Sequence, residues 1–135
     1  MRILLDTNVV LDFLLKRNPF DLEAKEIFKR SAIGDCQLYV SPITPINAFY
    51  TIRKEKSKAT AFSSVEGLMK LVDIAKTDKK VLQGAFKISF KDYEDAVQHE
   101  SAIAENLNAI VTRNEKDFKN GTIQIYSPVD FLKVL

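Results

Sequence analysis

Residues 1–15 read MRILLDTNVVLDFLL, and this stretch decides the fold. Ile3, Leu4 and Leu5 form a continuous apolar run, which is typical of a buried strand. Asp6 and Asn8 follow directly behind it, where the strand ends. A carboxylate held at the exit of a buried strand is costly unless something neutralises it. What this stretch does therefore depends on where the other carboxylates lie.

The rest of the chain alternates between short β-like runs and longer segments of helical period. The further runs are Gln37–Val40, a run around Ile74, Ala109–Val111 and Ile123–Tyr126, and helices are expected within 18–35, 41–56, 62–72, 78–88 and 92–107. Thr44 is the expected N-cap of the second helix, with Pro45 at its first position. Because parallel neighbours need crossover connections, this order predicts an α/β fold. We expect a three-layer α/β/α sandwich around a central, mainly parallel sheet of about five strands, forming one domain over residues 1–135.

Composition excludes several classes of protein. The chain has 135 residues, 46% of them hydrophobic, and a net charge of +2, which is ordinary for a globular protein. Cys36 is the only cysteine, so an internal disulfide and a cysteine-rich zinc site are both excluded. We expect Cys36 to be a small residue of the hydrophobic core. No apolar stretch approaches the ~20 residues of a membrane span, and we expect a soluble cytoplasmic protein without membrane contact.

Three predicted strands end in polar residues, and function in open parallel sheets gathers outside the carboxyl ends of strands. These side chains should therefore lie along one edge of the sheet. They come from LLDTN, YVSPIT and IVTRN, and comprise Asp6, Thr7, Asn8, Ser41, Thr44, Thr112, Arg113 and Asn114.

Two further carboxylates are expected at this edge. In the helix that begins near Asp92, a helical wheel places Asp95 beside Asp92 and His99, and points Glu94 elsewhere. Asp92 is expected to be the N-cap of this helix. Asp95 is expected in the first turn, where the helix dipole favours its negative charge. Asp117 alone reads as a turn residue.

Together, Asp6, Asp95 and Asp117 indicate more than caps and turns. Each pair at ~4 Å repels by ~4 kcal/mol at an effective dielectric near 20. Protonation, a buried Lys or Arg, or a divalent cation must offset that repulsion. Hard oxygen ligands without His or Cys suit Mg²⁺ or Mn²⁺. Such a site favours phosphodiester hydrolysis.

Basic residues near the strand exits are compatible with a nucleic-acid backbone and, equally, with a solvated helix face. His99 is expected to be a structural or surface residue, and the aromatic side chains of Phe49, Tyr50 and Tyr93 have core spacing. The basic residues are Arg53, Lys54, Lys56 and Lys58, with Lys16, Arg17, Arg113 and Lys116.

The motifs LLDTNVVLDFLL, KDYEDAV and IVTRNEKDF, in this order and at these distances, resemble the PIN domain, in particular its VapC-like group. The resemblance covers essentially the whole chain. It implies a Mg²⁺- or Mn²⁺-dependent ribonuclease, often the toxin of a toxin-antitoxin pair, with RNA, a cognate antitoxin and a second copy of itself as partners.

Carried over by residue, the resemblance makes Asp6, Asp95 and Asp117 metal-binding acids, accompanied by the polar residues Asn8, Thr112 and Asn114. Asn47 stands where the family usually has a Glu. An amide carries no charge, so this departure predicts that Asn47→Glu raises activity or metal affinity.

Two other functions stay open. Asn47 makes a catalytically weak PIN-like module that binds nucleic acid or protein credible. A phosphatase with Asp6 as the covalent nucleophile fits less well, because that chemistry usually needs a second Asp two residues later, where Asn8 stands.

Overall fold

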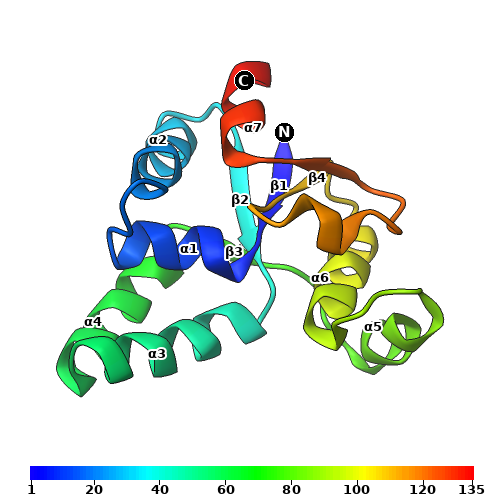
Figure 1. Cartoon of the computed structure of the whole chain (residues 1–135), viewed down its shortest axis with the longest axis horizontal. Helices are drawn as coiled ribbons and strands as arrows, with labels where there is room; N and C mark the ends of the chain where they lie inside the picture. The colour runs from blue at the N-terminus through cyan, green and yellow to red at the C-terminus, as the bar shows by residue number, and fades with distance from the viewer.

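The computed structural model describes residues 1–135. Its five strands form one parallel sheet in the order β3-β2-β1-β4-β5, which confirms the predicted sheet (Figure 1). The strands are β1 (Arg2–Leu5), β2 (Gln37–Val40), β3 (Asp73–Ile74), β4 (Ala109–Val111) and β5 (Gln124–Tyr126).

Helices cover both faces of this sheet, which confirms the three-layer arrangement (Figure 1). None of them is both long and apolar enough to cross a membrane. The α-helices are α1 (Thr7–Leu14), α2 (Asp21–Ala32), α3 (Ile43–Glu55), α4 (Lys58–Met69), α5 (Lys79–Gly84), α6 (Tyr93–Ala104) and α7 (Pro128–Val134), and the short 3-10 helices are η1 (Ala85–Lys87) and η2 (Glu115–Phe118).

The core divides at the sheet because successive strand side chains point to opposite faces. Ile3 and Leu5 of β1 pack with residues of α1, α2, α4 and α7. Leu4 between them packs against α6 and η2 on the other face. Cys36 belongs to the first of these two clusters, as predicted, and burial raises the pKa of its thiol, so it is a protonated packing residue.

Some local predictions were wrong. Helix α3 begins at Ile43, and Thr44 lies inside it, where its buried hydroxyl lies 2.8 Å from that of Thr7 and does not cap the helix. Tyr50 and Tyr93 are not core residues, since they are 60% and 43% exposed. The Tyr93 ring stacks on Phe86 at the surface instead.

The order of the strands creates a switch point between β1 and β4. From β1 the chain builds the sheet outward through β2 and β3, and it then returns to the other side of β1 to add β4 and β5. The connections on either side of β1 and β4 therefore diverge at the carboxyl ends of these strands. Crevices at such points are where open α/β sheets bind ligands.

Candidate active site

Asp6 lies at this switch point. It has an extended backbone at the N-cap position of α1, yet its side chain makes no cap hydrogen bond. One oxygen, Oδ2, accepts a hydrogen bond from the Thr112 hydroxyl at 2.8 Å, and Oδ1 accepts one from Gln98 Nε2 at 3.1 Å. Asp6 is only 5% exposed. Its carboxylate is therefore fixed by groups from the segment after β4 and from α6 rather than by its own helix.

The segment after β4 brings two more predicted residues to the same place. The Thr112 hydroxyl oxygen accepts a hydrogen bond from the backbone N–H of Asn114 at 3.0 Å. The Asn114 carbonyl in turn accepts one from the N–H of Asp117, at the same distance. This tight turn directs Asn114 and Asp117 toward the pocket that Asp6 lines.

Helix α3 contributes an amide and no charge. Asn47 Nδ2 donates a hydrogen bond to Glu94 Oε1 at 3.1 Å. The Thr7 hydroxyl lies 3.4 Å from the same oxygen, and it is also hydrogen-bonded to the Thr44 hydroxyl. Asn47 therefore lines the site, but its nearest charged partner is a carboxylate from α6.

Helix α6 presents its first turn to the pocket. Asp92 is the N-cap and accepts a hydrogen bond from the Asp95 N–H at 3.1 Å, as predicted. The prediction that Glu94 points elsewhere was wrong, because Glu94 lines the pocket together with Asp92 and Asp95. A helical wheel describes the side of a helix, whereas this pocket lies at the helix end, where side chains from the whole first turn can reach it.

These residues line one cavity of about 450 Å³, here called the acidic pocket. It contains five carboxylates and three Asn amides, and no Lys, Arg or His side chain lines it. Its lining consists of Asp6, Thr7, Asn8, Leu11, Asn47, Tyr50, Thr51, Asp92, Glu94, Asp95, Asn114 and Asp117.

Burial and neighbouring charges raise the pKa of two of these carboxyl groups, Asp95 and Glu94. Burial, followed by the charges of Asp6, Asp92, Asp117 and Glu94, raises the pKa of Asp95 to about 7. Burial also raises the pKa of Glu94, against the hydrogen bond from Asn47, which lowers it. Both shifts have the direction that desolvation and like charges produce. The fold therefore holds carboxylates where their charged forms are unfavourable.

The chemistry of the donors fits a hard divalent cation. Carboxylate and amide oxygens are the ligands that Mg²⁺ and Mn²⁺ prefer, and the pocket offers little else. The side chains are nevertheless spread, since no three His, Cys, Asp or Glu side chains are grouped so that together they can hold a metal ion. Mutual repulsion among the carboxylates favours such a spread arrangement.

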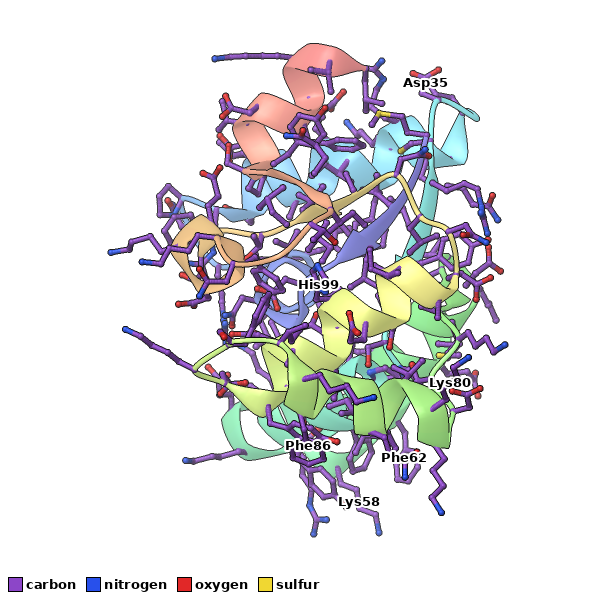
Figure 2. The ribbon with its side chains drawn as sticks, turned by 90° about the vertical axis from the view of Figure 1, so that its right-hand side faces the viewer. Asp35, Lys58, Phe62, Lys80, Phe86 and His99 are labelled. Carbon is purple, nitrogen blue, oxygen red and sulfur yellow. The ribbon has the colours of Figure 1, made fainter.

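Two residues outside the acidic pocket have structural roles. His99 belongs to α6 and is buried, and its Nε2 accepts a hydrogen bond from the Thr122 N–H at 3.0 Å (Figure 2). Its Nδ1 lies 2.9 Å from Glu100 Oε2, so the ring links α6 to the segment before β5. Arg113 was grouped with nucleic-acid contacts, but it pairs with the buried carboxylate of Asp12 through two bonds of 2.7 and 3.2 Å.

A second cavity of about 360 Å³ adjoins the acidic pocket and shares Asp92, Asp95 and Asp117 with it. Three lysines also line this second cavity, here called the groove lysines: Lys91, Lys116 and Lys119. Only Lys116 of these was predicted. The groove lysines place positive charge next to the acidic pocket but not inside it.

Sequence reasoning missed two residues of the site, Glu94 and Gln98. Gln98 is 1% exposed, and its Nε2 lies 3.1 Å from Asp6 Oδ1 and 3.5 Å from Asp95 Oδ1. Its spacing of three residues from Asp95 on one helix face was the available signal. Gln98 Oε1 is buried without a hydrogen-bond partner.

With the geometry described, the family follows. The profile of the PIN domain family matches residues 2–116, and the chain therefore belongs to the PIN domain family, as its motifs indicated. No curated protein matches the chain by sequence.

Solved structures agree on the fold. The chain is similar to VapBC from Salmonella typhimurium in its DNA-bound form, with a TM-score of 0.73 and 19% identity, covering 95% of this chain and 98% of that chain. It is similar to VapBC2 from Rickettsia felis bound to a promoter fragment, with a TM-score of 0.71 and 18% identity, covering 94% of this chain and 98% of that chain. It is also similar to VapC20 of Mycobacterium tuberculosis, a sarcin-ricin loop cleaving toxin, with a TM-score of 0.63 and 10% identity. That match covers 80% of this chain and 86% of that chain. The fold is therefore VapC-like.

Proposed function

We propose that the protein is a divalent-metal-dependent endoribonuclease that hydrolyses RNA phosphodiester bonds as the toxin of a toxin-antitoxin pair. The observation that carries this proposal is the acidic pocket, in which five carboxylates meet without a single cationic side chain. Burial and the neighbouring charges raise the pKa of Asp95 to about 7, so an external positive charge is needed to keep this carboxylate fully ionised at neutral pH. Membership of the PIN domain family supports nuclease chemistry for such a pocket.

Within this proposal Asp6, Asp95 and Asp117 would hold Mg²⁺ or Mn²⁺, whose charge would offset the repulsion that favours their spread arrangement. When bound, such a cation would supply positive charge for activating a water and stabilising the phosphate oxygens during displacement. Thr112 and Gln98 orient Asp6 through the hydrogen bonds at 2.8 and 3.1 Å. Asn8, Asn47 and Asn114 complete the polar lining.

The substrate enters beside the groove lysines. An acidic pocket alone repels a phosphodiester chain, so the neighbouring positive charges are needed to hold phosphates on either side of the cleaved bond. The groove lysines share the wall formed by Asp92, Asp95 and Asp117. Further exposed positive charges lie at the end of α3 and the start of α4, on Arg53, Lys54, Lys56 and Lys58.

The partners in the proposal are RNA, a cognate antitoxin and a second copy of the chain, all in the cytoplasm. Support comes from the neighbours in fold, which include toxin-antitoxin complexes and a toxin that cleaves the sarcin-ricin loop. Exposed apolar side chains beside the acidic pocket, among them Ile46, Tyr50 and Phe62, offer contact surface for a protein partner.

The test combines cation binding with RNA cleavage. Wild type and Asp6→Asn are titrated with Mn²⁺ by calorimetry and incubated with labelled RNA in Mn²⁺ or EDTA. Asp35→Asn, at the opposite end of the molecule from Lys58 and Phe62 (Figure 2), is the control for loss of one negative charge. We expect wild type and the control to bind Mn²⁺ and cleave, and Asp6→Asn to do neither.

A catalytically weak module that binds RNA or protein is the second candidate. The uncharged Asn47 is the observation that favours it, because α3 adds no carboxylate to the pocket. A wild type that binds RNA but neither binds Mn²⁺ nor cleaves would support this module and contradict the nuclease.

A further inference from the structure

The carboxylate of Glu94 is held by side chains from two other helices. Oε1 lies within 3.1 Å of Asn47 Nδ2 and 3.4 Å of the Thr7 hydroxyl, so groups from α3 and α1 converge on a single oxygen of a residue from α6. Thr44 Oγ1 lies 2.8 Å from Thr7 Oγ1 and fixes that hydroxyl in turn. This arrangement orients Glu94 through three helices.

The other oxygen is left free. Oε2 of Glu94 has no hydrogen-bond donor from the protein and is not sealed from the pocket. No Lys, Arg or His side chain forms an ion pair with Glu94. The carboxylate is therefore held in place by neutral donors, and its charge remains available to a ligand in the pocket.

The donors also explain what Asn47 does. An Asn at this position cannot add charge, but its amide N–H groups can hold a neighbouring carboxylate, which a Glu or Asp at the same position would repel. Thr7 and Asn47 both line the acidic pocket, so the oxygen that they bind faces the same space as Asp6.

We propose that Glu94 is an additional cation-binding carboxylate of the acidic pocket and that Asn47 is its positioning residue. The pair supplies from α6 the charge that α3 lacks. This inference rests on the proposed function, because it concerns the same cation. The inference goes beyond the proposed function by giving a cation-binding role to Glu94, which the sequence motifs do not select.

Reversal of the hydrogen bond provides the decisive test. Glu94→Gln keeps the size of the side chain and an acceptor for Asn47 but removes the charge. Asn47→Asp combined with Glu94→Gln exchanges donor and acceptor, so that the Gln amide donates to the new Asp and one carboxylate returns. The readout is Mn²⁺ affinity by calorimetry, with melting temperatures in EDTA to follow folding.

We expect Glu94→Gln to weaken Mn²⁺ binding by at least about tenfold to a hundredfold, because losing even a residue that only supports a ligand typically costs that much. The variant should melt no lower than wild type in EDTA. The double variant should regain most of the affinity. Asn47→Asp alone should not improve on wild type, because it places two carboxylates together. Glu100→Gln removes a charge from the same helix outside the acidic pocket and should bind Mn²⁺ as wild type does.

The outcomes separate the two proposals. If wild type binds no Mn²⁺, the proposed function fails. If wild type binds Mn²⁺ and Asp6→Asn does not, but Glu94→Gln binds as tightly as wild type, only the role of Glu94 is overturned. A Glu94→Gln variant that melts well below wild type in EDTA, without rescue of Mn²⁺ affinity by the double variant, would show that Glu94 only links α6 to α3.

Discussion

The repulsion inside the acidic pocket can be tested without any substrate by replacing Asp95 with Asn. Asp95 faces four other carboxylates, and together with burial they raise its pKa to about 7. Asn has nearly the same shape and can still accept a hydrogen bond, so Asp95→Asn removes mainly the charge. In the absence of a metal, we expect this variant to be more stable than wild type.

The size of the effect follows from the shift in pKa. The pKa of Asp95 is higher in the folded protein than in the unfolded chain, so folding favours the protonated form, and stability falls as pH rises from about 4 to about 7. A shift of this size corresponds to at most about 4 kcal/mol. Because Asp95 is only partly buried, solvent screening reduces the expected gain to about 2 kcal/mol at pH 8.

One favourable interaction is lost with the charge. Asp95 lies in the first turn of α6, where the helix dipole stabilises an anion by about 0.3–1 kcal/mol. The net gain at pH 8 is therefore about 1–2 kcal/mol, which corresponds to a melting temperature raised by about 5 °C. At pH 4 the carboxyl is protonated in the folded protein and only about half ionised in the unfolded chain, so the two proteins should melt nearly together.

Melting curves at pH 4, 6 and 8 in EDTA provide the assay, followed by a series in Mn²⁺ at pH 8. Asp130→Asn is a matched control, because Asp130 occupies the same position of α7, three residues after the capping Ser127, and is exposed beside Lys133. We expect the control to be slightly less stable than wild type at pH 8. Mn²⁺ should reverse the order of wild type and Asp95→Asn, because a cation that binds the folded wild type more tightly stabilises it by mass action.

A clear result would refute this reasoning. If Asp95→Asn behaves like Asp130→Asn in EDTA, with no gain at pH 8 and no dependence on pH, then the carboxylates of the acidic pocket do not repel one another as their placement requires. If Mn²⁺ in addition stabilises neither protein, the acidic pocket does not bind this cation, and the proposed metal-dependent nuclease activity has no physical basis.

Three further predictions concern the surroundings of the site. Gly121→Ala should lower the free energy of unfolding by about 1–3 kcal/mol in denaturant titrations, because the added Cβ would lie 2.6 Å from the fixed ring of His99; unchanged stability would contradict this. Arg113→Ala should cost about 3 kcal/mol, since it leaves Asp12 at 1% exposure without its partner, whereas a loss below about 1 kcal/mol would mean that water replaces the pair. Replacing all three groove lysines by Ala should reduce the slope of log affinity for single-stranded RNA against log salt by about 2, and an unchanged slope would place the RNA elsewhere.

The architecture was predictable because its signals are local. Strands β1, β2 and β4 are short, largely apolar runs followed by polar residues, and the helical segments between the strands require parallel pairing. Two helices were not predicted individually. Helix α1 continues the apolar run of β1 with little polar contrast, and α7 is a short segment that is recognised mainly by Ser127 as its cap and Pro128 at its first position.

The site was predictable only where chain position determined it. Asp6 and Thr112 directly follow the paired parallel strands β1 and β4, so the sheet itself brings them together. The direction of the Glu94 side chain was predicted wrongly because it depends on where α6 begins relative to the sheet. The hydrophobic periodicity of the sequence does not carry that information. The hydrogen bond partner of Glu94 was equally hidden, since Asn47 and Glu94 lie 47 positions apart in the chain.

The contact between these two residues changes what a substitution on α3 is expected to do. From the sequence, Asn47 is a missing charge, and Asn47→Glu restores it. In the structure, Asn47 Nδ2 lies 3.1 Å from a carboxylate oxygen of Glu94, so a Glu at position 47 replaces an attraction with a repulsion in a pocket that already holds five acids. We therefore expect Asn47→Glu alone to lower stability in EDTA and to bind Mn²⁺ no better than wild type. It should become favourable only together with Glu94→Gln, which removes the competing charge. Calorimetry of the single and double variants decides between the two views, since a gain in affinity by Asn47→Glu alone would mean that the two side chains do not meet.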